Sequence, residues 1–167
     1  MSGTPERFIT LTANANTECP ALVSYLHQHI PLTRDMQVNT AGLDVNGLAL
    51  ESPLAPNHNH QASAFGGSIA SLAMLAGWGL VWLALDHGHG TTIVVRDVRL
   101  EYLRPVRDVF RAVCPLPTVK TWEKFMHTLD RRHKARLDLE IAILCGETVC
   151  ARCSGRFVAY HSTRGNG

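Results

Sequence analysis

The fold of this chain is decided by SIASLAMLAGWGLVWLAL, the stretch from Ser68 to Leu85. It holds no charged residue, so we expect a helix that is buried on nearly every side. Its 18 residues are also close to the minimum that crosses a bilayer, which makes a membrane span the competing interpretation. We favour the buried helix because Gly77 and Gly79 interrupt the run and Asp86, rather than a basic residue, follows it.

Segments of alternating apolar and polar residues surround this helix, as expected of strands that are buried on one face. Before the helix, Met36 to Thr40 and Gly47 to Leu54 predict a hairpin with AGLDVNG as its turn. The alternation is clearest in Lys134 to Cys145, where charged and apolar residues take turns as far as Ile141. The other predicted strands are Thr92 to Leu103, Val109 to Pro115 and Glu147 to Tyr160.

Two shorter helices complete the predicted elements. The first runs from Cys19 to Pro31, with Pro20 in its first turn, and the second is TWEKFMHTL at 121–129. The order of elements predicts the α+β class and a hotdog fold, in which an antiparallel sheet wraps around a long apolar central helix. We expect a single domain over residues 14–161, with flexible polar termini at 1–13 and 162–167.

Composition narrows the classes of protein that this chain can belong to. Its 167 residues are 46% hydrophobic and 18% charged, which is typical of one globular domain. The net charge of +2 gives no basic face for nucleic acid, so any anionic partner should be small. Five cysteines are an odd number, and the amino-terminal MSGTPERFIT has no apolar stretch of the signal-peptide kind. We therefore expect a cytoplasmic protein that does not insert into a membrane.

The stretch NHNHQASAFGGSIASLAMLAGWG, Asn57 to Gly79, resembles the thioesterase-type domain at the carboxy terminus of the YiiD-type acetyltransferases, a branch of the hotdog superfamily. HIPLTRDM, which ends at Met36, and ESPLAPNHNH, Glu51 to His60, are similar to the same family. RLEYLRPV, Arg99 to Val106, resembles hotdog proteins in general. The sequence contains no stretch that we assign to an acetyltransferase half, so we expect the domain to stand alone.

The resemblance implies a homodimer or homotetramer that hydrolyses an acyl thioester of coenzyme A (CoA) or of an acyl-carrier protein. We expect no metal and no cofactor beyond the CoA moiety of the substrate. In better understood hotdog thioesterases, a loop Asn precedes a His-Gly-Gly helix start, and a carboxylate on the central helix activates water or attacks the carbonyl. Here Phe65 replaces the His, and Met74 occupies the place of the carboxylate. The usual mechanism is thereby put in doubt, but the fold is not.

The residues themselves offer an oxyanion site and a polar loop. Gly66 and Gly67 lack side chains, so their N–H groups at the positive end of the helix can approach a carbonyl oxygen. Asn59 can orient water, His60 can accept its proton near neutral pH, and Ser68 can assist by hydrogen bonding. The alternative is structural: the Gly pair serves the turn, Asn57 to Asn59 hold the loop, and Ser68 caps the helix.

Substrate contacts are predicted at two places. Phe65 and Met74 would lie beside the acyl chain, while Arg104, Arg131 and Arg132 have guanidinium groups that suit phosphate. Two rival functions remain open: a non-catalytic module that binds an acyl chain or an acyl carrier, and a hotdog-type hydroxyacyl dehydratase. The dehydratase would need a His and a carboxylate that converge.

Two other patterns are weak. The four histidines His58, His60, His87 and His89 stand in pairs two residues apart, without the Cys or carboxylate ligands that zinc sites use. Cys150 and Cys153 have C-x-x-C spacing, but residues three apart in a strand point to opposite faces, so we do not expect a redox pair.

Overall fold

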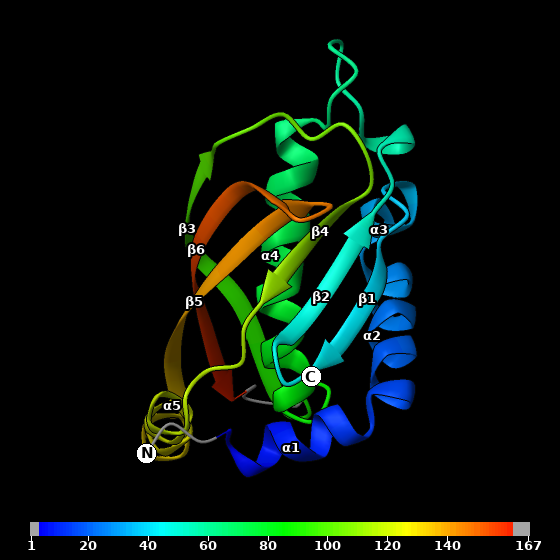
Figure 1. The fold of residues 1–167 in the computed structure, drawn as a ribbon. Coiled ribbons are helices and arrows are strands. Elements are labelled where there is room, and N and C mark those ends of the chain that lie inside the picture. Colours follow the sequence, from blue (N-terminus) through cyan, green and yellow to red (C-terminus); the bar gives the residue numbers. More distant parts are fainter. Residues whose placement is uncertain (1–3, 162–167) are drawn as a thin grey trace, which may run out of the picture.

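A computed structural model describes residues 4–161 of the chain as a curved antiparallel sheet with one long helix against it (Figure 1). The six strands are arranged in the order β1-β2-β4-β5-β6-β3. Their bounds are β1 (Asn39–Asp44), β2 (Gly47–Ser52), β4 (Phe110–Cys114), β5 (Lys134–Cys145), β6 (Thr148–His161) and β3 (Thr91–Tyr102). The predicted hotdog fold is therefore confirmed.

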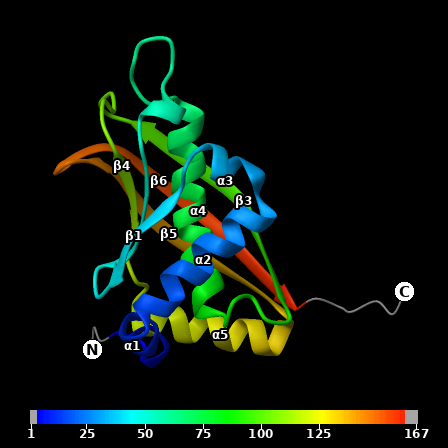
Figure 2. The same ribbon diagram turned by 90° about the vertical axis from the view of Figure 1, so that its right-hand side faces the viewer.

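The long helix is α4 (Gly66–Ala84), and it has neighbours on two sides (Figure 2). The sheet curves around one side, and α2 (Ala15–His29) crosses the other. With a mean hydropathy of 1.6, α4 is apolar and long enough to cross a membrane, yet 61% of its most apolar stretch is buried inside the protein. Burial between sheet and helix accounts for the run without charges.

Two glycines let these layers come close to α4. A Cβ on Gly77 would lie 2.3 Å from the ring of Phe157 on β6, and a Cβ on Gly79 would lie 3.0 Å from Leu22 on α2. The two glycines therefore face different layers, the sheet and the helix. They interrupt the apolar run because tight packing leaves no room for a side chain.

The predicted strands are present, with one shift. In β5 the side chains of Ala135, Leu137, Leu139 and Ile141 are buried and the charged residues between them are exposed, as the alternation predicts. The amino-terminal hairpin is confirmed, but its first strand is Asn39–Asp44 rather than Met36 to Thr40. Met36 instead ends α3 (Pro31–Asp35), and Gln37 turns the chain with φ 54°.

The predicted domain start at residue 14 is wrong. Residues Glu6–Ala13 form α1, where Phe8 and Leu11 are each 1% exposed. The ring of Phe8 meets Trp122 of α5 (Val119–Arg132) edge-on, with the ring centroids 5.0 Å apart. Arg7 donates hydrogen bonds to the carbonyls of Leu83 and Ala84 at the end of α4. Residues 1–3 and 162–167 lie outside the described residues, so their predicted flexibility stays a prediction.

The first predicted helix also extends further than expected. It begins at Ala15 rather than Cys19, so Pro20 lies inside α2 and not in its first turn. It ends at His29, one residue before Ile30 and the predicted stop at Pro31, which opens α3.

Candidate active site at the start of the central helix

A hollow of about 510 Å³ lies at the amino end of α4. Three segments form it: the loop between β2 and α4, the first turn of α4, and the segment in which β3 ends. The lining residues are Asn59, Ala64, Gly66, Gly67, Ile69, Tyr102, Leu103, Arg104, Pro105 and Val106. Of the predicted site residues, the structure thus brings together Asn59, the Gly pair and Arg104.

The hollow is bordered by backbone donors that the protein leaves unpaired. The N–H groups of Gly66, Gly67 and Ser68 have no acceptor among residues 4–161, and the Phe65 side chain does not cap the helix. The first paired donor is the N–H of Ile69, which bonds to the carbonyl of Phe65 at 3.1 Å. Three free donors at the positive end of a 19-residue helix form a site that favours a negative charge.

Aromatic side chains pack closely against both positions of the Gly pair. A Cβ on Gly67 would lie 2.3 Å from the ring of Phe65, and a Cβ on Gly66 would lie 3.1 Å from the hydroxyl of Tyr102. Close packing, the structural interpretation of the pair, is thus supported, and the functional interpretation stays a prediction. Ser68 does not cap α4, because Phe65 is the N-cap residue.

Tyr102 is a site residue that the sequence analysis missed. Its hydroxyl donates to the carbonyl of Gly66 at 2.7 Å, although the two residues stand 36 apart in the chain. That carbonyl belongs to the same planar peptide unit as the N–H of Gly67, so the bond orients this donor. Burial raises the pKa of the Tyr102 hydroxyl above its ordinary 10.0, which keeps it a donor at neutral pH. The sequence did offer one sign of this role: Tyr102 lies within RLEYLRPV, the stretch that resembles hotdog proteins, at the end of a predicted strand.

Asn59 holds the loop through its side chain. Its Oδ1 accepts hydrogen bonds from the N–H groups of Gln61 at 2.8 Å and Ser63 at 3.2 Å. Its Nδ2 donates to Ser63 Oγ at 3.1 Å, which leaves one N–H of the amide without a partner in the described structure. Because Oδ1 is already occupied, Asn59 can act on a ligand only as a donor.

Asn57, which the sequence analysis treated only as a turn residue, anchors the base of the loop. It is 2% exposed, and its Nδ2 donates to the carbonyls of Met36 at 2.9 Å and Pro53 at 2.8 Å. Its backbone carbonyl accepts from the N–H of Phe65 at 2.7 Å. These bonds connect α3, the loop and the start of α4.

A second set of bonds places the segment on the other side of the hollow. The N–H of Ala64 donates to the carbonyl of Val106 at 2.8 Å. The N–H groups of Leu103 and Arg104 both donate to the carbonyl of Cys150 on β6, at 2.8 and 3.0 Å. Arg104 thereby stays at the hollow, with its side chain exposed to solvent.

The remaining predicted site residues lie away from the hollow. His60 is exposed on the loop, and neither the His60 nor the Ser68 side chain is among the lining residues. Phe65 is 57% exposed, and Met74 is half-buried two turns further along α4. Arg131 and Arg132 belong to α5, at the other end of α4 (Figure 1). Arg104 is thus the single predicted arginine at the site.

Comparison with known proteins identifies the family. The family described as "Putative thioesterase (yiiD_Cterm)" matches residues 19–161. The chain belongs to this family. We call it the YiiD C-terminal family below.

Solved structures share the fold of this YiiD C-terminal family member. A protein of unknown function from Chlorobaculum tepidum is 29% identical, with a TM-score of 0.80 over 86% of this chain and 94% of that one. A protein described as a "putative thioesterase" from Shewanella oneidensis is also 29% identical, with a TM-score of 0.78 over 87% of this chain and 99% of that one. A Haemophilus influenzae thioesterase, 16% identical with a TM-score of 0.66 over 89% and 94%, shares the fold.

This YiiD C-terminal family member has no ionisable base in its hollow. Its lining contains no Asp, Glu or His, and α4 carries no carboxylate along its whole length. What the described site supplies is a set of hydrogen-bond donors and one guanidinium group. It can stabilise a developing negative charge, and the proton acceptor must come from outside the lining residues.

Proposed function

We propose that this protein hydrolyses acyl thioesters of CoA or of an acyl-carrier protein at the amino end of α4. The observation that carries the proposal is the set of three unpaired N–H groups, Gly66 to Ser68, beside a hollow of about 510 Å³. When water adds to the thioester carbon, the carbonyl oxygen gains a negative charge. Donors that are already in place stabilise that charge without any rearrangement.

We assign the steps of hydrolysis to the donors of the hollow, to His60 on the loop and to Arg104 at its mouth. The Gly66 and Gly67 N–H groups and the spare N–H of Asn59 donate to the oxyanion, since Asn59 has no free acceptor with which to orient water. His60, next to Asn59 on the exposed loop, accepts the proton of the attacking water. The C–S bond then breaks, and the thiolate leaves and takes up a proton. Arg104 contacts phosphate at the mouth of the hollow.

A second copy of the chain completes the proposed site. Along α4, Met74, Leu75 and Trp78 are only half-buried, and β3 has a strand partner, β6, on one edge alone. Tyr102 and Leu103, at the end of β3, are 54% and 40% exposed. A homodimer, or a tetramer of two dimers, would cover these apolar groups and enclose the acyl chain beside Met74. Sedimentation should accordingly give a mass that is a multiple of 18.4 kDa.

We also infer that the protein works in the cytoplasm. All five cysteines are free thiols, and a reducing compartment would keep them so.

One alternative has an observation in its favour. Because no acid or histidine lines the hollow, the alternative is that this protein is a module that binds acyl thioesters without cleaving them. The same observation counts against a dehydratase, which needs a His and a carboxylate that converge.

The deciding experiment is to incubate the protein with a panel of acyl-CoA esters and acyl-carrier proteins and to measure the free thiol released. Turnover above the uncatalysed rate supports hydrolysis, and His60→Ala should lower this turnover if His60 accepts the proton of the attacking water. His58→Ala is the matched control, because His58 is also exposed on this loop. Saturable binding without thiol release would support the binding module instead.

A further inference from the structure

One side of α4 stays half-exposed within residues 4–161, because the sheet packs against one flank of the helix and α2 against another. Along this side the half-buried residues recur at every third or fourth position, while most residues between them are buried. We call this side the open stripe, and its residues are Gly67, Ser71, Met74, Leu75 and Trp78. The stripe begins at Gly67, which is also a donor of the proposed oxyanion site.

β3 runs beside the open stripe and is tied to α4 at two points. The hydroxyl of Tyr102 donates to the carbonyl of Gly66 at 2.7 Å, and Nε1 of Trp78 donates to the carbonyl of Ile93 at 3.0 Å. A β-bulge between these points changes the alternation of β3, so that its apolar side chains stay on the inner face. The half-buried side chains of this inner face are Val95, Val98 and Leu100.

Trp78 crosses the open stripe and touches both of its neighbours. Its Nε1 bonds to β3, and its ring stacks on Tyr25 of α2 with the ring centroids 5.9 Å apart. Figure 1 shows β3 and α2 on opposite sides of α4. One turn further along α4, the ring of Trp82 stacks on Trp78 with the centroids 6.0 Å apart. A ring held on both sides and from below has little freedom to move, so the stripe ends at Trp78.

Between Gly67 and Trp78 the open stripe offers mostly apolar surface. Ser71 is its single polar side chain, and the Ser71 hydroxyl already donates to the carbonyl of Gly67 at 2.8 Å. Met74 and Leu75 provide the remaining side chains of the stripe. Such a surface contacts a hydrocarbon chain well and offers no side-chain donor to a polar one.

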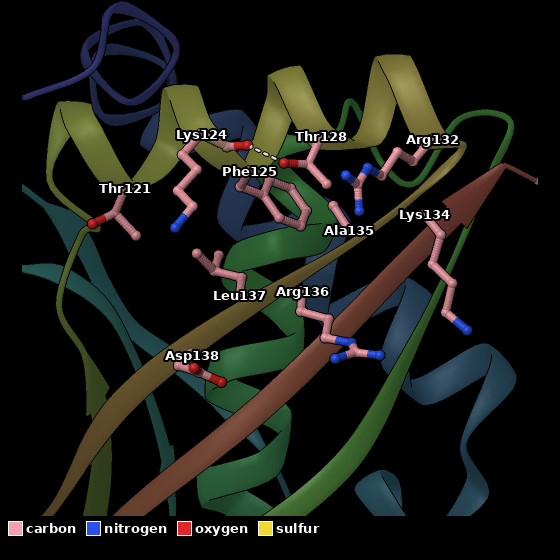
Figure 3. Close-up of a pocket in the computed structure, with 10 residues that line it drawn as sticks. All are labelled: Thr121, Lys124, Phe125, Thr128, Arg132, Lys134, Ala135, Arg136, Leu137 and Asp138. Carbon is pink, nitrogen blue, oxygen red and sulfur yellow. Dashed lines mark hydrogen bonds between the residues drawn. The ribbon is translucent and has the colours of Figure 1, made fainter.

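A hollow of about 530 Å³ between α5 and β5 is the other place that could hold an acyl chain. Figure 3 shows Phe125 and Leu137 between the two elements, whereas Lys134 and Arg136 point away from α5. This hollow lies at the opposite end of α4 from Gly67 (Figure 1). A chain held at Gly67 would have to pass the 19 residues of α4, about 28 Å, to reach it. The open stripe begins at Gly67 itself.

We propose that the acyl chain lies along the open stripe and that Trp78 limits its length, so that the substrates are medium-chain acyl thioesters. This rests on the proposed function, in which the N–H of Gly67 holds the carbonyl oxygen. The 11 residues from Gly67 to Trp78 span about 16 Å of helix. The Trp78 side chain leans back over the preceding turn, which leaves about 11 Å. With C–C bonds of about 1.5 Å an extended chain advances about 1.25 Å per carbon, so about eight to ten carbons fit.

The limit is tested with acyl-pantetheine analogues in which a methylene group separates the sulfur from the carbonyl, so that they cannot be hydrolysed. Pantetheine is common to CoA and to acyl-carrier proteins, and the chains run from butyl to hexadecyl. Calorimetric titration of the full chain should show affinity rising about fourfold with each added carbon. The affinity should reach its maximum at about eight to ten carbons and fall for longer chains.

Two substitutions should move this maximum in opposite directions. Trp78→Leu opens the end of the stripe and should shift the maximum by about three or four carbons, one helical turn, to longer chains. Met74→Trp fills the stripe one turn earlier and should shift it by about as much to shorter chains. Phe125→Leu is the control, because it removes a ring from the hollow between α5 and β5 and should leave the maximum in place. Circular dichroism checks that each variant is folded.

The inference is overturned if affinity keeps rising through hexadecyl in the wild type, if both substitutions leave the maximum in place, or if no analogue binds. Because the analogues are not cleaved, these results do not depend on hydrolysis. A protein that shows the expected length profile but releases no thiol from the matching acyl thioesters would contradict the proposed hydrolysis and support the length limit. Thiol release at the same kcat/KM for every chain length would contradict the length limit alone.

Discussion

The hydroxyl of Tyr102 donates a hydrogen bond of 2.7 Å to the carbonyl of Gly66, and so the end of β3 is tied to the first residue of α4. The carbonyl of Gly66 and the N–H of Gly67 share one peptide plane, and withdrawing electron density from the carbonyl strengthens the N–H as a donor. Tyr102 is thus a positioning residue in the proposed reaction. It acts through the backbone and not on the substrate.

Replacing Tyr102 by Phe should lower kcat about five- to tenfold and change KM little, because one hydrogen bond that orients the oxyanion donor is lost. The amide resonance of Gly67 should shift in the NMR spectrum of glycine-labelled protein. A Tyr102 that only supported packing at another place would leave this resonance unchanged. Tyr160→Phe is the control, since Tyr160 is an exposed tyrosine on β6. Equal kcat in the Tyr102 variant and the wild type would contradict the role.

The same hydrogen bond predicts an effect of alkaline pH. A tyrosinate cannot donate, and burial favours the neutral hydroxyl, so the pKa of Tyr102 lies above its ordinary 10.0. The contribution of the bond is therefore complete below pH 10.0 and is lost as the pH rises through the raised pKa. Wild-type kcat should show this alkaline loss, and Tyr102→Phe should lack it.

Gly67 allows the backbone donor to be removed without removing a side chain. Gly67→Pro deletes the N–H, and proline is tolerated in the first turn of a helix. We expect turnover to fall on the order of a hundredfold, the usual cost of losing an oxyanion donor. Gly67→Ala is the matched control, because its Cβ meets the same Phe65 ring but the N–H remains. If the Ala and Pro variants lose the same activity, crowding by Phe65 explains the loss and the donor role is wrong.

Asn59 has two separable roles, and two substitutions distinguish them. Asn59→Ala loses the bonds that hold the loop and should lower the free energy of unfolding by about 1–3 kcal/mol, besides lowering turnover. Asn59→Asp keeps the acceptor for the N–H groups of Gln61 and Ser63, so thermal unfolding should stay near that of the wild type. It loses the amide donor and places a negative charge beside the oxyanion, so kcat should fall. Unchanged kcat in folded Asn59→Asp would assign Asn59 to the loop alone.

The amino-terminal helix should contribute to stability. Phe8→Ala should lower the free energy of unfolding by about 3–5 kcal/mol, because it leaves a cavity beside Trp122. Ile9→Ala, one residue along on the exposed face of α1, should cost less than about 0.5 kcal/mol. Denaturant unfolding measures both. If Phe8→Ala lowers the free energy of unfolding as little as Ile9→Ala does, α1 does not contribute to the stability of the core.

The sequence by itself determined those parts of the protein in which neighbouring residues carry the information. The charge-free run predicted α4 to within two residues at its start, and the alternation in Lys134–Cys145 predicted both bounds of β5 and its buried face. The Gly pair and Asn59 were also recognisable, because a helix start and a polar loop have local patterns. In each of these cases one face of a single element meets the core, and spacing along the chain reveals that face.

Only the tertiary structure decided which distant segments meet. It joined Tyr102 to Gly66, seated α1 on α5 and on the end of α4, and placed Arg131 and Arg132 at the far end of α4 from the hollow that Arg104 borders. No periodicity reports such contacts, because they depend on how the sheet curves and where the helices cross it. α1 shows this most clearly, because only two of its eight side chains are buried and its own sequence gives little sign of a core element. It belongs to the core because it contacts Trp122 and the carboxyl end of α4, which lie more than 70 residues away in the chain.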